Sequence, residues 1–433
     1  MKMKKMNLER RNVNLEWCFK NTRSIEQFTH GYHRYPAKFL PNLVKKLIEE
    51  YTKPDDTIVD MFAGCGTTLV EAKLHGRKSI GVDINPVAEL IARVKTNPIV
   101  PSKLQDKFDN LVDGFGQFNS DNYKNIDVHE RLDYWFVPEN KNKIIFLNKE
   151  ISRIKNAEIM AFFQVSLSHI LKNCSRWLQS STKPQIDPKK PIVDPFAAFI
   201  FHSKQMIKKN AEFYEYLEEK DFLDVQCEIK LKDARKTSIP KNSVGAIITS
   251  PPYVTSYEYA DIHQLTAYWY NYITTLADFR QNFIGTFYSL NENIECNSEI
   301  AQKIVNGVFK KDARTAKEIA NYFKDMQSVI MEMYRILRDN GYVCIVIGNT
   351  TFRDVKIKST EVFVDLLNKS GFKVVNIIKR SIPHKLIPTI RDKATGKFAK
   401  MDSANSKLVY PDEYIVIAQK KEIRRTRGKY GHN

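Results

Sequence analysis

The sequence predicts an α/β fold in which a doubly wound, mostly parallel sheet is interrupted by a largely helical insertion. Three observations predict it. A strand, a glycine turn, a helix and a second strand follow one another near the N-terminus; the same alternation resumes after residue 227; and the segment between has helical periodicity. Because helices separate the strands, the connections are crossovers and the strands lie parallel.

The first half of the sheet is expected before residue 98. A β-branched run leads into two closely spaced glycines and a helical stretch, after which a second strand follows. The next helix begins near Pro86, which suits a first helical turn, and stops at Asn97-Pro98. The predicted strands are residues 57–62 and 78–83, and the predicted helices are residues 43–51, 67–75 and 86–97.

The second half of the sheet is expected after residue 227. Runs rich in β-branched and aromatic residues alternate there with two amphipathic helices, and the last two strands form a closing pair. The predicted strands are residues 227–231, 244–249, 342–348, 373–379 and 414–419, and the predicted helices are residues 316–337 and 359–369.

The domain boundaries are placed where the pattern of alternating strands and helices gives way to helical periodicity and where it resumes. Residues 1–97 and 228–420 are predicted to form one domain that is divided by a mainly helical insertion at residues 98–227. A second insertion, at residues 270–314, is rich in aromatic residues and Asn. Residues 421–433 form a basic tail.

Composition narrows the class of protein. The 433-residue chain carries 68 Lys and Arg against 50 Asp and Glu, so its net charge of +18 attracts polyanions such as nucleic acid. The six cysteines form neither a CxxC pair nor a Cys/His cluster at metal spacing, so neither a metal nor a disulfide framework is expected. No apolar run approaches the roughly 18 residues of a membrane span, which favours a cytoplasmic protein.

A ligand site is predicted where the first strand meets its helix. The segment from Asp60 to Thr68 contains two glycines, so the backbone can turn sharply and a ligand can approach it closely. It is neither a P-loop nor a dinucleotide fingerprint, because Leu69 stands where a third glycine would be. Asp83 ends the next strand about 20 residues later, where a carboxylate can accept hydrogen bonds from both ribose hydroxyls. The pattern indicates a nucleotide or nucleoside site without a pyrophosphate.

The same turn resembles the first motif, FxGxGTT, of the S-adenosylmethionine-dependent amino-methylating DNA methyltransferases. The resemblance implies a seven-stranded Rossmann-like methyltransferase sheet, S-adenosylmethionine as the cofactor and double-stranded DNA as the partner. It also places Asp60 and Asp83 among the residues that bind the cofactor. The residues that match the motif, and are expected at the cofactor with them, are Phe62, Gly64, Gly66, Thr67 and Thr68.

Two further matches extend the expected cofactor site. Tyr35, Phe39 and Pro41 lie in a segment similar to the family's tenth motif, whose aromatic and proline flank the methionine moiety. On physical grounds alone, the same residues suit a hydrophobic staple at the start of a helix. Asp233, 17 residues before Ser250, matches the acidic residue of the third motif that faces the adenine amino group; a turn or helix-cap aspartate is the alternative.

The predicted catalytic residues are Ser250, Pro251, Pro252 and Tyr253, which follow a strand and match the family's fourth motif. Consecutive prolines remove two N–H donors, so the backbone presents carbonyl oxygens in a rigid arrangement. A nucleobase amino group that donates its hydrogens to a Ser250 oxygen and the Pro251 carbonyl is favoured in the pyramidal form that attacks a sulfonium methyl. Tyr253 is expected to stack on a base turned out of the duplex.

The resemblance implies a site-specific DNA methyltransferase of a prokaryotic restriction-modification kind, with a cognate restriction endonuclease as an expected partner. It continues past the tetrapeptide in Tyr259, His263 and Trp269. Serine at the first position is most typical of transfer to the 4-amino group of cytosine. The 6-amino group of adenine suits the same acceptors, the guanine 2-amino methyltransferases of RNA use similar tetrapeptides, and a catalytically silent nucleic-acid-binding subunit is a further alternative. Carbon-5 methylation of cytosine is disfavoured, because no cysteine follows a proline.

The helical insertion is the candidate for reading the DNA sequence. The sheet is accounted for without it, and its Lys, Arg and aromatic residues suit phosphate and base contacts. Residues 270–314 are expected to help to close over the DNA. A structural role or a subunit contact is the alternative for the helical segment.

Overall fold

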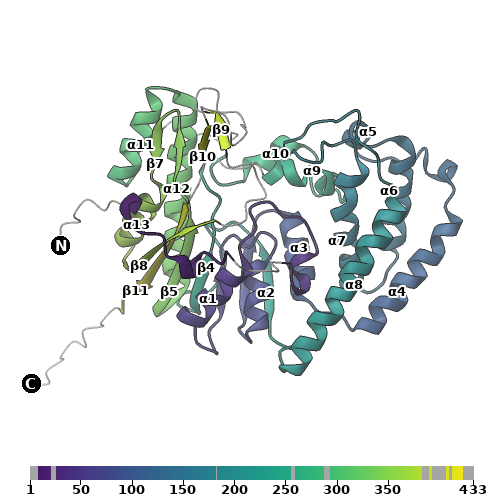
Figure 1. The fold of residues 1–433 in the computed structure, drawn as a ribbon, viewed down its shortest axis with the longest axis horizontal. Coiled ribbons are helices and arrows are strands. Elements are labelled where there is room, and N and C mark those ends of the chain that lie inside the picture. Colours follow the sequence, from purple (N-terminus) through teal and green to yellow (C-terminus); the bar gives the residue numbers. More distant parts are fainter. Residues whose placement is uncertain are drawn as a thin grey trace, which may run out of the picture.

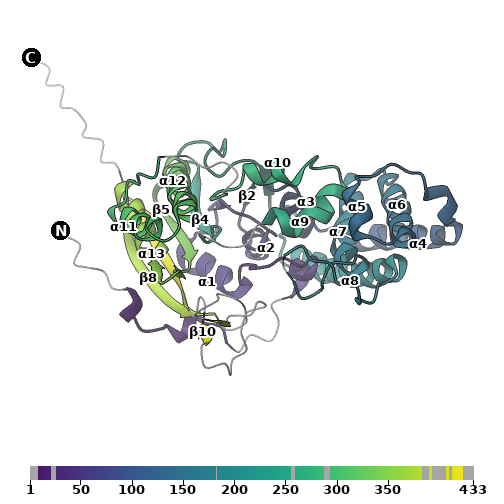
Figure 2. The same ribbon diagram turned by 90° about the horizontal axis from the view of Figure 1, so that it is seen from above.

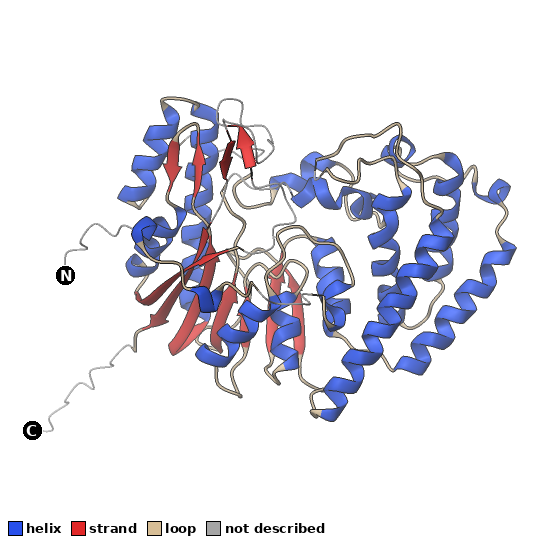
Figure 3. Ribbon diagram, in the orientation of Figure 1, coloured by secondary structure: helices blue, strands red, loops and turns tan. Residues whose placement is uncertain are grey.

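Seven strands form one sheet in the computed structural model, and helices cover both of its faces (Figure 1, Figure 3). The structure describes residues 8–20, 26–181, 183–254, 259–286, 293–382, 390–392, 406–408 and 412–422. Within these ranges, no helix combines the length and the apolar character that crossing a membrane requires.

The sheet is doubly wound, which confirms the predicted fold class. Its order is β3-β2-β1-β4-β5-β11-β8, so the chain moves outward from β1 in one direction and later from β4 in the other. Neighbours from β3 to β5 are parallel, whereas β11 is antiparallel to both β5 and β8. The strands are β1 (Ile58–Asp60), β2 (Ser79–Asp83), β3 (Cys227–Leu231), β4 (Val244–Thr249), β5 (Leu337–Ile347), β8 (Phe372–Ser381) and β11 (Asp412–Lys420).

Alternate residues of each strand face two different helical layers, as the two-residue period of a strand requires. In β1, Ile58 packs in a cluster with α1, and Val59 packs in another cluster with α11, α12 and α13. The helices next to the sheet are α1 (Pro41–Tyr51), α2 (Thr67–Leu74), α3 (Pro86–Thr96), α11 (Glu299–Phe309), α12 (Ala313–Ile336) and α13 (Ser359–Lys369).

A helical body stands beside the β3 end of the sheet (Figure 1, Figure 2). Its hydrophobic core is continuous with side chains of α3, such as Leu90, and of α9 (Tyr259–Trp269), such as Trp269. The body is therefore packed on two elements of the sheet-bearing part. Its helices are α4 (Pro101–Asp113), α5 (Arg131–Trp135), α6 (Pro138–Ser152), α7 (Ala157–Cys174) and α8 (Pro195–Glu219).

The remaining described elements are short. Two antiparallel pairs lie outside the main sheet, and α10 (Leu276–Gln281) follows α9. The pairs are β6 (Thr350–Phe352) with β7 (Val355–Ile357), and β9 (Ile390–Asp392) with β10 (Ser406–Leu408). The 3-10 helices are Leu8–Arg10, Leu15–Trp17, Phe28–Gly31, Gly114–Gln117 and Ser120–Tyr123.

Every strand and helix that the sequence predicts is present, with bounds that differ by a few residues. The largest difference is β5, which begins at Leu337 and not at residue 342. Its first residues continue directly from α12 through the polar Arg338, Asp339 and Asn340, and Asn340 has φ of 62°. A polar stretch of this kind carries no strand signal. The predicted basic tail from residue 423 onward lies outside the described residues.

Candidate active site

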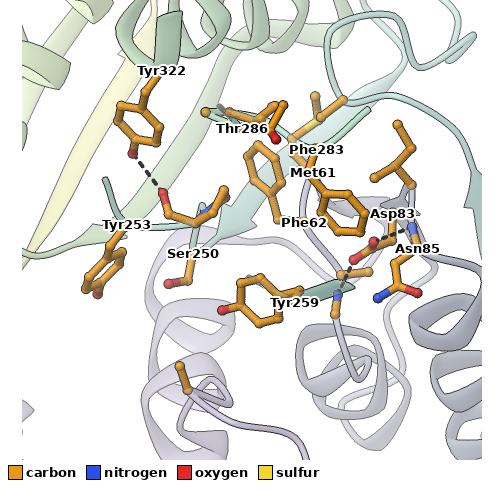
Figure 4. A pocket seen from close by; sticks show the side chains of 18 of the residues that line it. Met61, Phe62, Asp83, Asn85, Ser250, Tyr253, Tyr259, Phe283, Thr286 and Tyr322 are labelled. Atoms are coloured by element: carbon orange, nitrogen blue, oxygen red, sulfur yellow. Dashed lines mark hydrogen bonds between the residues drawn. The ribbon is translucent and has the colours of Figure 1, made fainter. Parts of the chain in front are cut away.

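A cavity of about 340 Å³ opens at the carboxyl ends of β1, β2 and β4, where the winding direction of the sheet reverses. Ser250 and Tyr253 lie toward one end of it, and Asp83 and Asn85 lie toward the other (Figure 4). The predicted site residues that line the cavity are Tyr35, Phe39, Asp60, Phe62, Gly64, Thr67, Asp83, Asp233, Ser250, Pro252 and Tyr253. The cavity lining does not include Pro41, Gly66, Thr68 or Pro251.

The carboxylate of Asp83 is held in place by backbone N–H groups. Gly64 N donates to Oδ2 over 2.8 Å, and Asn85 N donates to Oδ1 over 2.9 Å. Each oxygen keeps a lone pair for a further donor. Burial raises the pKa of Asp83 to about 6, against the opposing effect of these N–H groups. At neutral pH the side chain is therefore mainly ionised and oriented to accept from a ligand.

The Asp60 carboxylate accepts hydrogen bonds from other residues of the protein. Its Oδ1 accepts from the hydroxyl of Thr249 and from Phe62 N, and its Oδ2 accepts from the hydroxyl of Thr68, over distances of 2.6, 3.0 and 2.6 Å. Burial raises the pKa of Asp60 and these hydrogen bonds oppose that rise. One carboxylate thus ties together β1, the end of β4 and the first turn of α2. The hydroxyl of Thr68 is therefore bonded to Asp60, and Thr68 itself does not line the cavity.

The two glycines of the turn have different neighbours. Both have positive φ, 49° at Gly64 and 79° at Gly66. A Cβ on Gly64 would approach the ring of Tyr35 to 3.3 Å, so this glycine leaves room for an aromatic wall of the cavity. A Cβ on Gly66 would lie 2.9 Å from the Cβ of Ala92 in α3. Glycine at position 66 therefore permits the close approach of α2 and α3.

The outer residues of the predicted cofactor site also have protein partners. Asp233 forms a bidentate ion pair with Arg235, whose Nη2 lies 2.6 Å from Oδ2, and Arg235 also bonds to Asp325 over 2.7 Å. Pro41 is buried as the first residue of α1, where its missing N–H and fixed φ suit a helix start.

The tetrapeptide is fixed by bonds to three other elements, of which Figure 4 draws the bond from Tyr322. Ser250 Oγ donates to the carbonyl of Val346 in β5 over 3.2 Å. The Tyr322 hydroxyl of α12 donates to the Pro252 carbonyl over 2.8 Å, and the Tyr253 hydroxyl donates to Glu413 Oε2 in β11 over 2.9 Å. The Ser250 side chain also interacts with that of Tyr253, and both line the cavity.

Several cavity residues carry no motif that could have revealed them. Asn282 to Thr286 and Tyr322 reach the cavity from α10 and α12, far from the motifs in sequence. Asn85 follows Asp83 and caps α3 by accepting from Val87 N. Tyr259 stands in the predicted continuation of the tetrapeptide and stacks on Tyr35, with ring centroids 5.9 Å apart.

The lining suits a nucleoside. An ionised carboxylate at a strand end, a second carboxylate 150 positions further along the chain, and aromatic rings supply acceptors for hydroxyl and amino groups together with surfaces for stacking. These are Asp83, Asp233, Tyr35, Phe39 and Phe62.

Known proteins resemble the chain over most of its length. It is 26% identical to the type II methyltransferase M.MvaI of Kocuria varians over 405 residues, which covers 86% of this chain and 87% of that protein. It is 23% identical to the type II methyltransferase M.BsoBI of Geobacillus stearothermophilus over 418 residues, covering 81% and 80%. A crystal structure of a SAM-dependent methyltransferase from Methanosarcina mazei shares 11% identity, covers 90% of this chain and 100% of that chain, and has a TM-score of 0.31.

A family model described as DNA methylase, N6_N4_Mtase, matches residues 1–93 and 244–430. These residues contain the glycine turn, Asp83 and the tetrapeptide, and the gap between the two matched segments contains the helical body. The methyl donor of the chain is S-adenosylmethionine, and its substrate is DNA. The chain therefore belongs to the N6_N4_Mtase family of DNA methylases and is a DNA amino-methyltransferase.

Proposed function

We propose that the enzyme methylates the 4-amino group of cytosine within a short recognition sequence of double-stranded DNA. The observation that carries this proposal is Ser250, which leads the tetrapeptide and lines the cavity. In the amino-methylating DNA methyltransferases that the sequence resembles, serine at this position is most typical of transfer to the cytosine 4-amino group. The base is turned out of the duplex to reach the cavity.

The residues of the chain have separate parts in this reaction. Bound S-adenosylmethionine supplies a methyl group on a sulfonium sulfur. Asp83 holds the ribose hydroxyls, Asp233 faces the adenine amino group, and Tyr35 and Phe39 flank the methionine moiety. Ser250 Oγ and the Pro251 carbonyl accept the two amino hydrogens, so the nitrogen lone pair points at the methyl carbon. Transfer of that methyl group to the amino nitrogen would leave a neutral sulfide on the cofactor and would release one proton from the nitrogen.

Mass spectrometry of nucleosides from DNA treated with the enzyme is expected to show 4-methylcytosine. The reason is that Ser250 and Pro251 act on an exocyclic amine, and no cysteine follows a proline to attack carbon 6 of the ring. A product that contains only 6-methyladenine would overturn the choice of base. RNA given in place of DNA is expected to remain unmethylated. Methylated guanine in that RNA would favour the alternative function, an RNA guanine 2-amino methyltransferase.

We further propose that the helical insertion, residues 98–227, reads the DNA sequence, while residues 1–97 and 228–420 carry cofactor binding and catalysis. The helices from α4 to α8 add no strand to the sheet, and their surface exposes Tyr134 and Phe201, at 49% and 67% of their full accessibility. Aromatic side chains that are exposed on a body with many Lys residues suit stacking and phosphate contacts. The segment 270–314, which supplies Asn282 to Thr286 to the cavity wall, helps to close over the DNA.

Exchange of residues 101–224 with the corresponding segment of a relative that recognises a different sequence is expected to transfer that sequence preference. The methylated atom is expected to stay the same, because the tetrapeptide chooses it. Sequencing of modified DNA checks both. The hybrid must keep side chains that match α3 and α9, whose residues share the core of this body. A folded hybrid that binds cofactor and methylates the original sequence would place the readout elsewhere, first in residues 270–314.

The type II naming of the relatives supports a role beside a restriction endonuclease that cuts the same sequence. Methylation of the shared sequence would then protect the DNA of the cell.

A further inference from the structure

A buried pair of opposite charges lies beside the tetrapeptide, in the part of the sheet that the cofactor does not need. Arg380 of β8 and Glu413 of β11 are direct partners in the antiparallel register. The Arg380 guanidinium bonds to Glu413 Oε1, and only 2% of Arg380 and 8% of Glu413 are exposed. The carboxylate is therefore held in place by its partner.

The second oxygen of Glu413 holds the ring of Tyr253. The Tyr253 hydroxyl donates to Glu413 Oε2 over 2.9 Å. Burial and the neighbouring Glu413 raise the pKa of Tyr253 well above its usual value, so the hydroxyl stays protonated and remains a donor. At the end of β5, a Cβ on Gly348 would come within 2.9 Å of Cε2 of the same ring. The ring thus lies against a glycine on one side and is tethered at its hydroxyl.

Stability alone does not explain this charged pair. Removing two charges from water costs about as much as their attraction returns, and apolar residues of similar volume are often equally stabilising at such positions. The neighbours of Glu413 along β11 are apolar and buried, from Tyr414 to Ala418. What an apolar pair could not do is accept a hydrogen bond from Tyr253.

We infer that Glu413 and Arg380 are positioning residues for the target base: they hold in place the Tyr253 ring on which the base stacks. Arg380 orients the Glu413 carboxylate, Glu413 tethers the hydroxyl, and Gly348 leaves room for the ring at the end of β5. The inference rests on the proposed stacking role of Tyr253. It does not depend on which amino group is methylated.

A double-mutant cycle tests the inference. Arg380→Met with Glu413→Leu removes both charges together and leaves neither unpaired, and Tyr253→Phe removes only the hydroxyl. Each change is expected to lower the single-turnover methylation rate about 10- to 150-fold, which corresponds to the loss of a hydrogen bond to a charged group. In the Tyr253→Phe background, the change of the pair is expected to lower the rate no further than twofold. Cofactor affinity, measured by calorimetry, is expected to stay within twofold throughout.

The matched control is Asp412→Asn. It removes an ion pair to Lys379, with Nζ and Oδ2 3.1 Å apart, between the same two strands and away from the tetrapeptide. Its rate is expected to stay within twofold of that of the unchanged enzyme. If this apolar pair does not fold, Arg380→Leu with Glu413→Met repeats the cycle with a second pair of uncharged side chains, which likewise cannot accept the hydroxyl hydrogen.

Two results would overturn the inference. The first is an unchanged methylation rate in the enzyme with the apolar pair or in the Tyr253→Phe enzyme. The second is that the apolar pair lowers the rate by the same factor whether position 253 is Tyr or Phe. The rate is measured as labelled methyl groups incorporated into DNA, whatever the base. A product of 6-methyladenine would therefore correct the proposed function and leave the coupling between Glu413 and Tyr253 measurable.

Discussion

Replacement of Asp83 by alanine is expected to weaken the binding of S-adenosylmethionine about 10- to 150-fold. Loss of a charge-assisted acceptor of this kind costs about 1.5–3 kcal/mol. The carboxylate is already oriented by the N–H groups of Gly64 and Asn85, so little ordering is needed when the ribose hydroxyls bind. Calorimetric titration measures the effect. Asp106→Ala, at an exposed position of α4, is the control and is expected to leave the affinity unchanged.

The same site predicts how affinity depends on pH. Asp83 has a pKa raised to about 6, and only its ionised form accepts from both hydroxyls. Affinity is therefore expected to be full above pH 7 and to fall as the pH drops through 6. Asp83→Asn is expected to bind weakly with no such dependence between pH 5 and 8. An unchanged affinity in Asp83→Ala, or the same pH profile in Asp83→Asn, would remove the assignment.

The substitution Gly66→Val is expected to destabilise the fold by about 2–6 kcal/mol, a large share of the stability of an ordinary domain. A β-branched residue at φ of 79° is strained by about 1–3 kcal/mol, and its Cβ would overlap Ala92, which adds the similar cost of overpacking. Chemical denaturation followed by circular dichroism measures the loss.

Gly114→Val is the matched control. A Cβ at Gly114 would meet no atom within 4 Å and its φ is −66°, so less than about 1 kcal/mol is expected. Ala92→Gly in the Gly66→Val background is expected to restore part of the stability, because it removes the atom that the new side chain would strike. Equal stability of the two valine variants would show that the turn tolerates a side chain.

The sequence was most informative where hydrophobic pattern and turn chemistry agree. The bounds of β4 and of α13 match the prediction to the residue, because a buried apolar run and a well-formed amphipathic repeat each stop at polar residues. The two glycines predicted a sharp turn correctly. They could not reveal that Gly66 faces Ala92, since contacts between helices are set by the packing of elements distant in sequence.

The motif residues of the candidate site could be predicted from the sequence, but the residues that hold them in place could not. Asp83 and Ser250 were found by their spacing and their place at strand ends. Tyr322 and Glu413 reach the tetrapeptide across 70 and 160 positions, and no spacing rule connects them to it. Arg380 follows Lys379 and Glu413 follows Asp412, so the sequence gives no sign that this one pair of charges is buried.

Strand β11 lies between β5 and β8, although the ribosome makes it after both. Proteins emerge from the ribosome N-terminus first, so the cofactor turn and the tetrapeptide leave the exit tunnel well before residues 412–420. Until then β8 has no strand to join, and the carboxylate that tethers Tyr253 does not yet exist. A nascent chain therefore acquires its complete catalytic centre only when this strand inserts, and a translation product that stops short of residue 412 presents an open sheet edge to chaperones and proteases.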